Sequence, residues 1–151
     1  PRPDGWNIVF WGMLWVAAAL RIWTRMVLGE HSRAQSLQAP VLVTDGPYRW
    51  CSHPLYLSNV VMGGALTLVS GWAWPVKIAG FLVLVCFYIV LAVREDIYLA
   101  KRYGKEWENW RKGQLERVSL SSQVSCVRAW WSDRWTWFWW GVVFCVIWVR
   151  I

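Results

Sequence analysis

The chain has 151 residues, 57% of them hydrophobic, and a mean hydropathy of +0.29. This apolar fraction is more than a domain of this length can bury, which excludes an ordinary water-soluble globule. The net charge of +7 does not indicate nucleic-acid binding, because the basic residues lie between long apolar segments and form no reading motif. We therefore expect an integral membrane protein whose partners are the lipid bilayer and apolar molecules, with no nucleic acid.

Four apolar segments have about the length that crosses the roughly 30 Å hydrocarbon core of a bilayer. Each segment is continuous rather than alternating, and in lipid this favours helices, which pair every backbone amide internally. In chain order they run over Trp6–Met26, Leu55–Trp74, Val76–Val93 and the shorter Trp135–Ile151. The expected fold is all-α integral membrane, with about four transmembrane helices in one domain over residues 1–151.

A short turn, Ser70–Pro75, joins the second and third segments. Gly71 favours the end of a helix, and Pro75 suits the first turn of the next one. We therefore expect an antiparallel helical hairpin at the core of the fold. The start of its first helix and the end of its second should lie at the same membrane depth.

The segment after the hairpin, Arg94–Lys112, mixes charged and aromatic residues in a pattern typical of a helix in the membrane interface. Gly104 is expected to break it into two helices. If all four apolar segments span, the long connections 29–54 and 94–134 share one side with every basic residue except Arg2, Lys77 and Arg150. The positive-inside rule predicts that this side is cytoplasmic.

The cysteines and tryptophans give weaker indications. The 4 cysteines show no C-x-x-C spacing, so we expect structural thiols and no metal site. Many of the 16 tryptophans lie near predicted helix ends, where indole rings anchor a helix at the headgroups. The C-terminal cluster is denser than anchoring requires, and the alternative to anchoring is contact with a flat or polyene ligand or with another subunit. Its members are Trp135, Trp137, Trp139 and Trp140.

Two polar clusters flank the hairpin on the same predicted side, within Gly46–Tyr56 and at Arg94–Asp96. Together they would form a pocket with histidine, arginine, tyrosine and two carboxylates at the membrane boundary. The alternative interpretation is that the charges only flank the helix ends and reach toward the headgroups.

The loop L-V-T-D-G-P-Y-R-W-C-S-H-P-L-Y at Leu42–Tyr56 is followed, after one hairpin, by R-E-D-I-Y-L-A-K-R-Y-G-K-E-W-E-N-W from Arg94. This spaced pair of motifs resembles the isoprenylcysteine carboxyl methyltransferase and phospholipid methyltransferase superfamily. The resemblance covers a core of about residues 20–112 and leaves the Trp-rich helix of about 135–151 as an addition.

The resemblance implies a cytoplasm-facing pocket for S-adenosylmethionine, joined to a tunnel for an apolar substrate. In it, Glu95 and His53 would bind the cofactor, Arg49 and Tyr48 would shape the loop, and Tyr56 would form the pocket wall. No catalytic residue is assigned. The cofactor-binding residues implied by the matching motifs are Tyr48, Arg49, His53, Pro54, Tyr56, Glu95 and Asp96.

The chain departs from the superfamily pattern at Ser52, where arginine is usual, and near Pro40, where histidine is usual. A hydroxyl cannot replace the contact of a guanidinium with a carboxylate. Two hypotheses therefore stand. The first is a methyltransferase for a lipid or isoprenoid-type acceptor. The second is a non-catalytic subunit of a larger membrane complex that binds lipid or a carotenoid-type or chlorophyll-type pigment.

Overall fold

The structure, a computed structural model, describes residues 5–28, 42–113 and 124–149, and every regular element within them is a helix. The predicted all-α class is thus confirmed for this part of the chain. Pro40, near which the chain departs from the superfamily pattern, lies outside the described residues. The elements are α1 (Gly5–Leu28), the 3-10 helix η2 (Gly46–Arg49), α2 (Pro54–Val69), α3 (Trp74–Tyr103), α4 (Lys105–Arg111), α5 (Cys126–Ser132) and α6 (Arg134–Val149).

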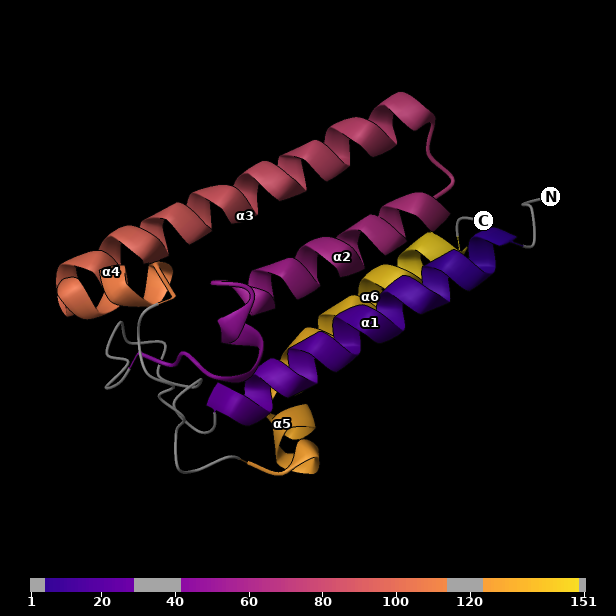
Figure 1. The fold of residues 1–151 in the computed structure, drawn as a ribbon. Coiled ribbons are helices and arrows are strands. Elements are labelled where there is room, and N and C mark those ends of the chain that lie inside the picture. The colour runs from indigo at the N-terminus through magenta and orange to yellow at the C-terminus, as the bar shows by residue number, and fades with distance from the viewer. Residues whose placement is uncertain (1–4, 29–41, 114–123, 150–151) are drawn as a thin grey trace.

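The long helices run side by side, with α2 between α3 on one side and α1 together with α6 on the other (Figure 1). Successive long helices up to α3 run in opposite directions, and α6 runs opposite to α1. One end of the bundle therefore gathers the end of α1, the start of α2, the end of α3 and the start of α6, together with η2, α4 and α5. We call this the polar end.

Two helices are long and apolar enough to cross a membrane, Ile8–Leu28 of α1 and Trp74–Tyr103, which is α3. The helices α2 and α6 have 16 residues each. At a rise of about 1.5 Å per residue they extend about 24 Å, less than the roughly 30 Å of a hydrocarbon core.

The hairpin forms as predicted, with different helix boundaries. The first helix ends at Val69 rather than Trp74, where the amide of Ser70 donates to Leu66 O at 3.1 Å. Pro75 lies in the first turn of α3, where its missing N–H leaves no hydrogen bond unmade. The start of α2 and the end of α3 meet at the polar end, as the antiparallel arrangement requires.

The third predicted helix was placed too short, because α3 continues through the charged residues Arg94–Tyr103. Its 30 residues extend about 45 Å, roughly 15 Å beyond a hydrocarbon core. The expected interfacial helix is therefore not separate at Arg94 but continuous with α3. The predicted break at Gly104 is confirmed: this residue has φ +53 and lies between α3 and α4.

The apolar core lies between α1, α2 and α6. Gly63 and Gly64 bring α3 close to α2, since a Cβ on Gly63 would come within 2.2 Å of the Leu84 side chain. None of the α3 residues is buried, so α3 touches the rest of the chain along one narrow line. The core contains buried Phe10, Ala65, Leu66 and Val69, packed against Met13, Leu14, Trp140 and Phe144.

Candidate functional site

The loop before α2 is shaped by η2 and by its packing on α1. The amides of Trp50 and Cys51 both donate to Pro47 O, at 3.2 and 3.1 Å. Gly46 has φ +61, and a Cβ there would come within 2.6 Å of the Val27 side chain. Only glycine combines this backbone conformation with so close an approach to α1. The Gly-Pro-Tyr sequence therefore fixes the loop against the end of α1.

His53, the residue before α2, lies between two consecutive carboxylates of α3. Its Nδ1 is 3.3 Å from Glu95 Oε2, and its Nε2 is 3.0 Å from Asp96 Oδ1. Asp96 Oδ2 accepts from Nη1 of Arg111 at 2.8 Å, which brings in α4. We call His53, Glu95, Asp96 and Arg111 the histidine cluster. It joins the loop, α3 and α4 at the polar end.

The histidine cluster favours a charged imidazole ring. Partial burial is the strongest single influence and would lower the pKa of His53, but the hydrogen bonds and charges of Glu95 and Asp96 together raise this pKa above its ordinary value. With a carboxylate at each ring nitrogen, only the imidazolium form can donate to both. The cluster thus combines a cationic ring with two carboxylates, of which Glu95 is the more exposed.

Tyrosines of η2, α2 and α3 lie next to the histidine cluster. The Tyr56 ring stacks on His53 with a centroid distance of 5.4 Å and lies 5.5 Å from the ring of Tyr88. The Tyr56 hydroxyl also lies close enough to the Glu95 carboxylate to interact with it. Burial raises the pKa of Tyr48 above its ordinary value, and the Glu95 charge raises it further. Tyr48 therefore stays a neutral hydroxyl beside the cluster.

The structure thus brings together five of the seven predicted cofactor-binding residues: Tyr48, His53, Tyr56, Glu95 and Asp96. Pro54 is buried as the first residue of α2. Arg49 is exposed and makes none of the contacts of the histidine cluster. Arg111 was not among the predicted residues, although its position directly after the second motif, seven residues after Gly104, was a usable signal.

The C-terminal tryptophans divide into two pairs. Trp137 and Trp140 line an apolar groove of about 220 Å³ between α1, α2 and α6, whereas Trp135 and Trp139 are exposed. The lining is almost entirely hydrocarbon and aromatic. It consists of Trp11, Leu14, Ala18, Met62, Leu66, Trp137, Trp140, Gly141 and Phe144.

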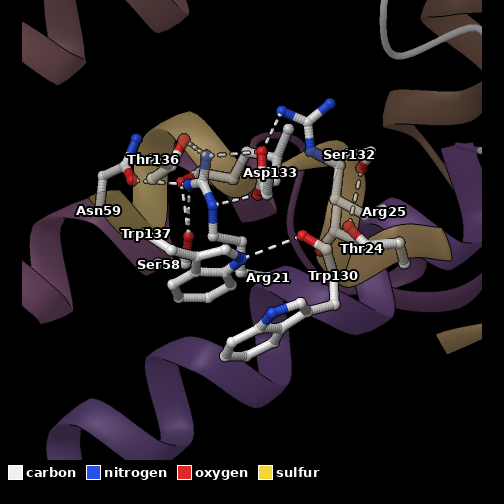
Figure 2. A network of polar contacts seen from close by, with 12 residues as sticks. Arg21, Thr24, Arg25, Ser58, Asn59, Trp130, Ser132, Asp133, Thr136 and Trp137 are labelled. Atoms are coloured by element: carbon white, nitrogen blue, oxygen red, sulfur yellow. Dashed lines mark hydrogen bonds and ion pairs between the residues drawn. The ribbon is translucent and has the colours of Figure 1, made fainter. Parts of the chain in front are cut away.

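A second polar cluster, absent from the sequence predictions, lies where α1 and α2 meet the junction of α5 and α6 (Figure 2). Buried Arg21 and Asp133 form an ion pair, and Arg25 Nη2 lies 2.6 Å from Asp133 Oδ1. We call Arg21, Arg25, Asp133 and their hydrogen-bond partners Ser58, Asn59 and Thr136 the arginine cluster. Two arginines four residues apart inside an apolar helix were the available signal.

Comparison with known proteins shows the family of this chain. A family model described as phospholipid methyltransferase matches residues 7–106, which is more than half of the chain. The match contains α1 from residue 7 onward, α2, α3 and the whole His53–Glu95–Asp96 contact, but neither α5 nor α6. No curated protein and no solved structure matches the chain. The extent of the family match is sufficient to conclude that this chain belongs to the phospholipid methyltransferase family.

Proposed function

We propose that this chain is a membrane-embedded methyltransferase that uses S-adenosylmethionine and acts on an apolar acceptor of lipid or isoprenoid type. The observation that carries the proposal is the contact of His53 with both Glu95 and Asp96 at the polar end of the α2–α3 hairpin. Family membership supports the reaction class and the cofactor. Under this proposal α1, α2, α3 and α6 all span the membrane, the 16-residue helices α2 and α6 where the bilayer is locally thinned, and the long connections face the cytoplasm.

The residues at the histidine cluster suit this cofactor, which carries a sulfonium, an ammonium and a carboxylate group. Glu95 and Asp96 offer carboxylates for cationic groups, and the faces of Tyr56 and Tyr88 offer aromatic surface for a sulfonium. The indole Nε1 of Trp107 in α4 is buried and has no hydrogen-bond partner among the residues that the structure describes. This donor is available to a ligand.

The work of the protein in such a reaction is alignment. The cofactor supplies an electrophilic methyl group, and in-line transfer depends mainly on positioning and on exclusion of water. Glu95 binds and orients, the His53 imidazolium keeps Glu95 and Asp96 at fixed separation, and the Tyr56 ring closes the membrane side. Asp96 also forms an ion pair with Arg111, and this pair fixes α4 next to the cluster. The acceptor would arrive from the bilayer between α2 and α3.

Calorimetric titration of the purified protein with S-adenosylmethionine in detergent tests the proposal. Wild-type protein should bind, and Glu95→Ala should abolish binding because it removes the most exposed carboxylate of the histidine cluster. Glu108→Ala is the matched control, since Glu108 is an exposed carboxylate of α4 outside the cluster. No binding to wild-type protein at millimolar cofactor would refute the enzyme proposal, and unchanged affinity in Glu95→Ala would refute the site.

A second candidate function rests on the apolar groove. Its aromatic lining by Trp137 and Trp140 suits a hydrocarbon or polyene molecule, which favours a non-catalytic subunit that binds lipid or pigment within a membrane complex. The two functions differ in a simple observation. A visible absorption band in the purified protein, together with no cofactor binding, would favour the second function over the first.

A further inference from the structure

The guanidinium of Arg21 is fully engaged by its own chain. Nε donates to Asp133, and Nη1 donates to Asn59 Oδ1 at 2.7 Å and to Ser58 Oγ at 3.4 Å. Nη2 donates to Thr136 Oγ1 at 3.0 Å and to Asp133 Oδ1 at 3.4 Å. A guanidinium has five N–H groups, and each of them has an acceptor here. Arg21 therefore acts as an internal connection between α1, α2 and the α5–α6 junction.

The backbone of Asp133, which pairs with both arginines, is itself fixed by hydrogen bonds. It lies between α5 and α6, where its amide donates to Trp130 O at 3.1 Å and its carbonyl accepts from the Trp137 amide at 3.1 Å. The Trp137 indole also donates to Trp130 O at 3.2 Å, and the two rings stack at 4.6 Å (Figure 2). A carboxylate on so constrained a junction fixes where Arg21 and Arg25 can lie.

The part of α1 that contains Arg21 and Arg25 also contacts loop 44–53, through residues on another face of the helix. Val27 contacts Gly46, and the Trp23 ring lies 5.6 Å from the ring of Trp50. Arg25 lies close enough to Tyr48 for its charge to influence that hydroxyl. A displacement of this part of α1 would therefore move the residues that place His53 at the start of α2.

A second contact joins the end of α1 to the C-terminal part of the chain, because the amide of Val124 donates to Met26 O at 3.3 Å. Both Asp133 and Val124 lie beyond the family match, which ends at residue 106. Packing of apolar side chains tolerates small sliding movements, whereas a buried ion pair with directional hydrogen bonds favours one arrangement.

We propose that Asp133 is a positioning residue: through Arg21 and Arg25 it sets the position of the end of α1, and thereby of loop 44–53. The C-terminal helices thus become a structural requirement for a site to which they contribute no contact. The positioning of the loop stands on the contacts above, and its consequence for cofactor affinity rests on the proposed function.

Asp133→Asn tests the proposal, because the amide keeps the shape of the side chain but lacks the charge. Hydrogen exchange of peptides over 44–53 should report at least tenfold faster exchange at the Trp50 and Cys51 amides. Affinity for S-adenosylmethionine should fall about tenfold. The control is Val69→Ala, which removes buried volume at the opposite end of α2, with exchange compared at an equal loss of thermal stability.

Arg25→Gln provides the second variant, since it leaves every hydrogen bond of Arg21 in place and serves if Asp133→Asn does not fold. Faster loop exchange in either cluster variant, but not in Val69→Ala, supports the proposal. Equal exchange in all variants, or equal acceleration in the control, overturns it. If wild-type protein binds no cofactor, the proposed function fails, and the exchange measurement still decides the positioning.

Discussion

The histidine and arginine clusters lie at the same end of the bundle but differ in construction. The histidine cluster is partly exposed, has all its members except Arg111 within the family match, and lies near the Trp107 indole, whose N–H has no hydrogen-bond partner among the described residues. The arginine cluster is buried, reaches into helices beyond the family match, and satisfies all five Arg21 donors within the chain. The first has the character of a binding site, and the second that of a structural junction.

The largest expected effect is on stability at the junction. Arg21→Met removes one partner of a buried ion pair and leaves the charge of Asp133 less compensated, which should lower the free energy of unfolding by about 3–5 kcal/mol. Arg111→Met removes the half-exposed partner of Asp96 and should cost only about 0–1 kcal/mol. Denaturation in detergent measures both. Equal losses would remove the distinction between the clusters.

A smaller loss is expected where the loop meets α1. Gly46→Ala places a Cβ at φ +61 and within 2.6 Å of Val27, so the unfolding free energy should fall by roughly 1–2 kcal/mol. Gly12→Ala is the matched control, because Gly12 lies within α1 and a Cβ there meets nothing within 4 Å. It should raise stability by about 0.5–1 kcal/mol. A neutral Gly46→Ala would show that the loop is not fixed by this contact.

Of the two clusters, the histidine cluster is the one that a change of pH should affect. The pKa of His53 is raised in the folded protein, so the stability that its contacts supply is complete below the ordinary value of about 6.5 and is lost as pH rises through the higher folded value. The arginines keep their charge throughout this range. Thermal stability of wild-type protein should therefore fall as the pH rises above about 6.5, and His53→Gln should remove this dependence. An unchanged pH profile in the variant would contradict the assignment.

The smallest effect should come from Arg49. It is exposed and makes no contact with the histidine cluster, so Arg49→Ala should change S-adenosylmethionine affinity by less than about twofold. Calorimetric titration of Arg49→Ala and Glu95→Ala with S-adenosylmethionine compares the two affinities. A large loss of affinity would mean that the loop rearranges on binding to bring Arg49 into contact.

The hairpin and most of the histidine cluster could be predicted because their information is local. Pro75 marks the start of a helix, and antiparallel helices bring the residues near His53 and Glu95 to one end. The extension of α3 past Val93 could not be predicted in this way, since Arg94, Glu95 and Asp96 look like a helix end although the backbone continues through them. Charge shows where a helix leaves the membrane, not where it stops.

The arginine cluster needed information that residue spacing does not contain. Arg21 and Asp133 are 112 positions apart, and several other acidic residues were equally plausible partners for a buried arginine. The seven residues of α5 are too few to show a helical period, so the junction that carries Asp133 was read as part of a connection. Arg21 could be recognised as unusual, but its partner could not be named.

The full engagement of Arg21 also has a consequence for biosynthesis. An arginine at the centre of a membrane helix opposes insertion by about 2.5–3.5 kcal/mol, and the cost is smaller toward the helix end, where Arg21 and Arg25 lie. The helix that carries Arg21 and Arg25 is made before α5 and α6, and Asp133 leaves the ribosome more than a hundred residues after Arg25. During that interval α1 carries two charges without their acidic partner, which makes its insertion less favourable. The helix α1 therefore reaches its final stability only after α5 and α6 have been made.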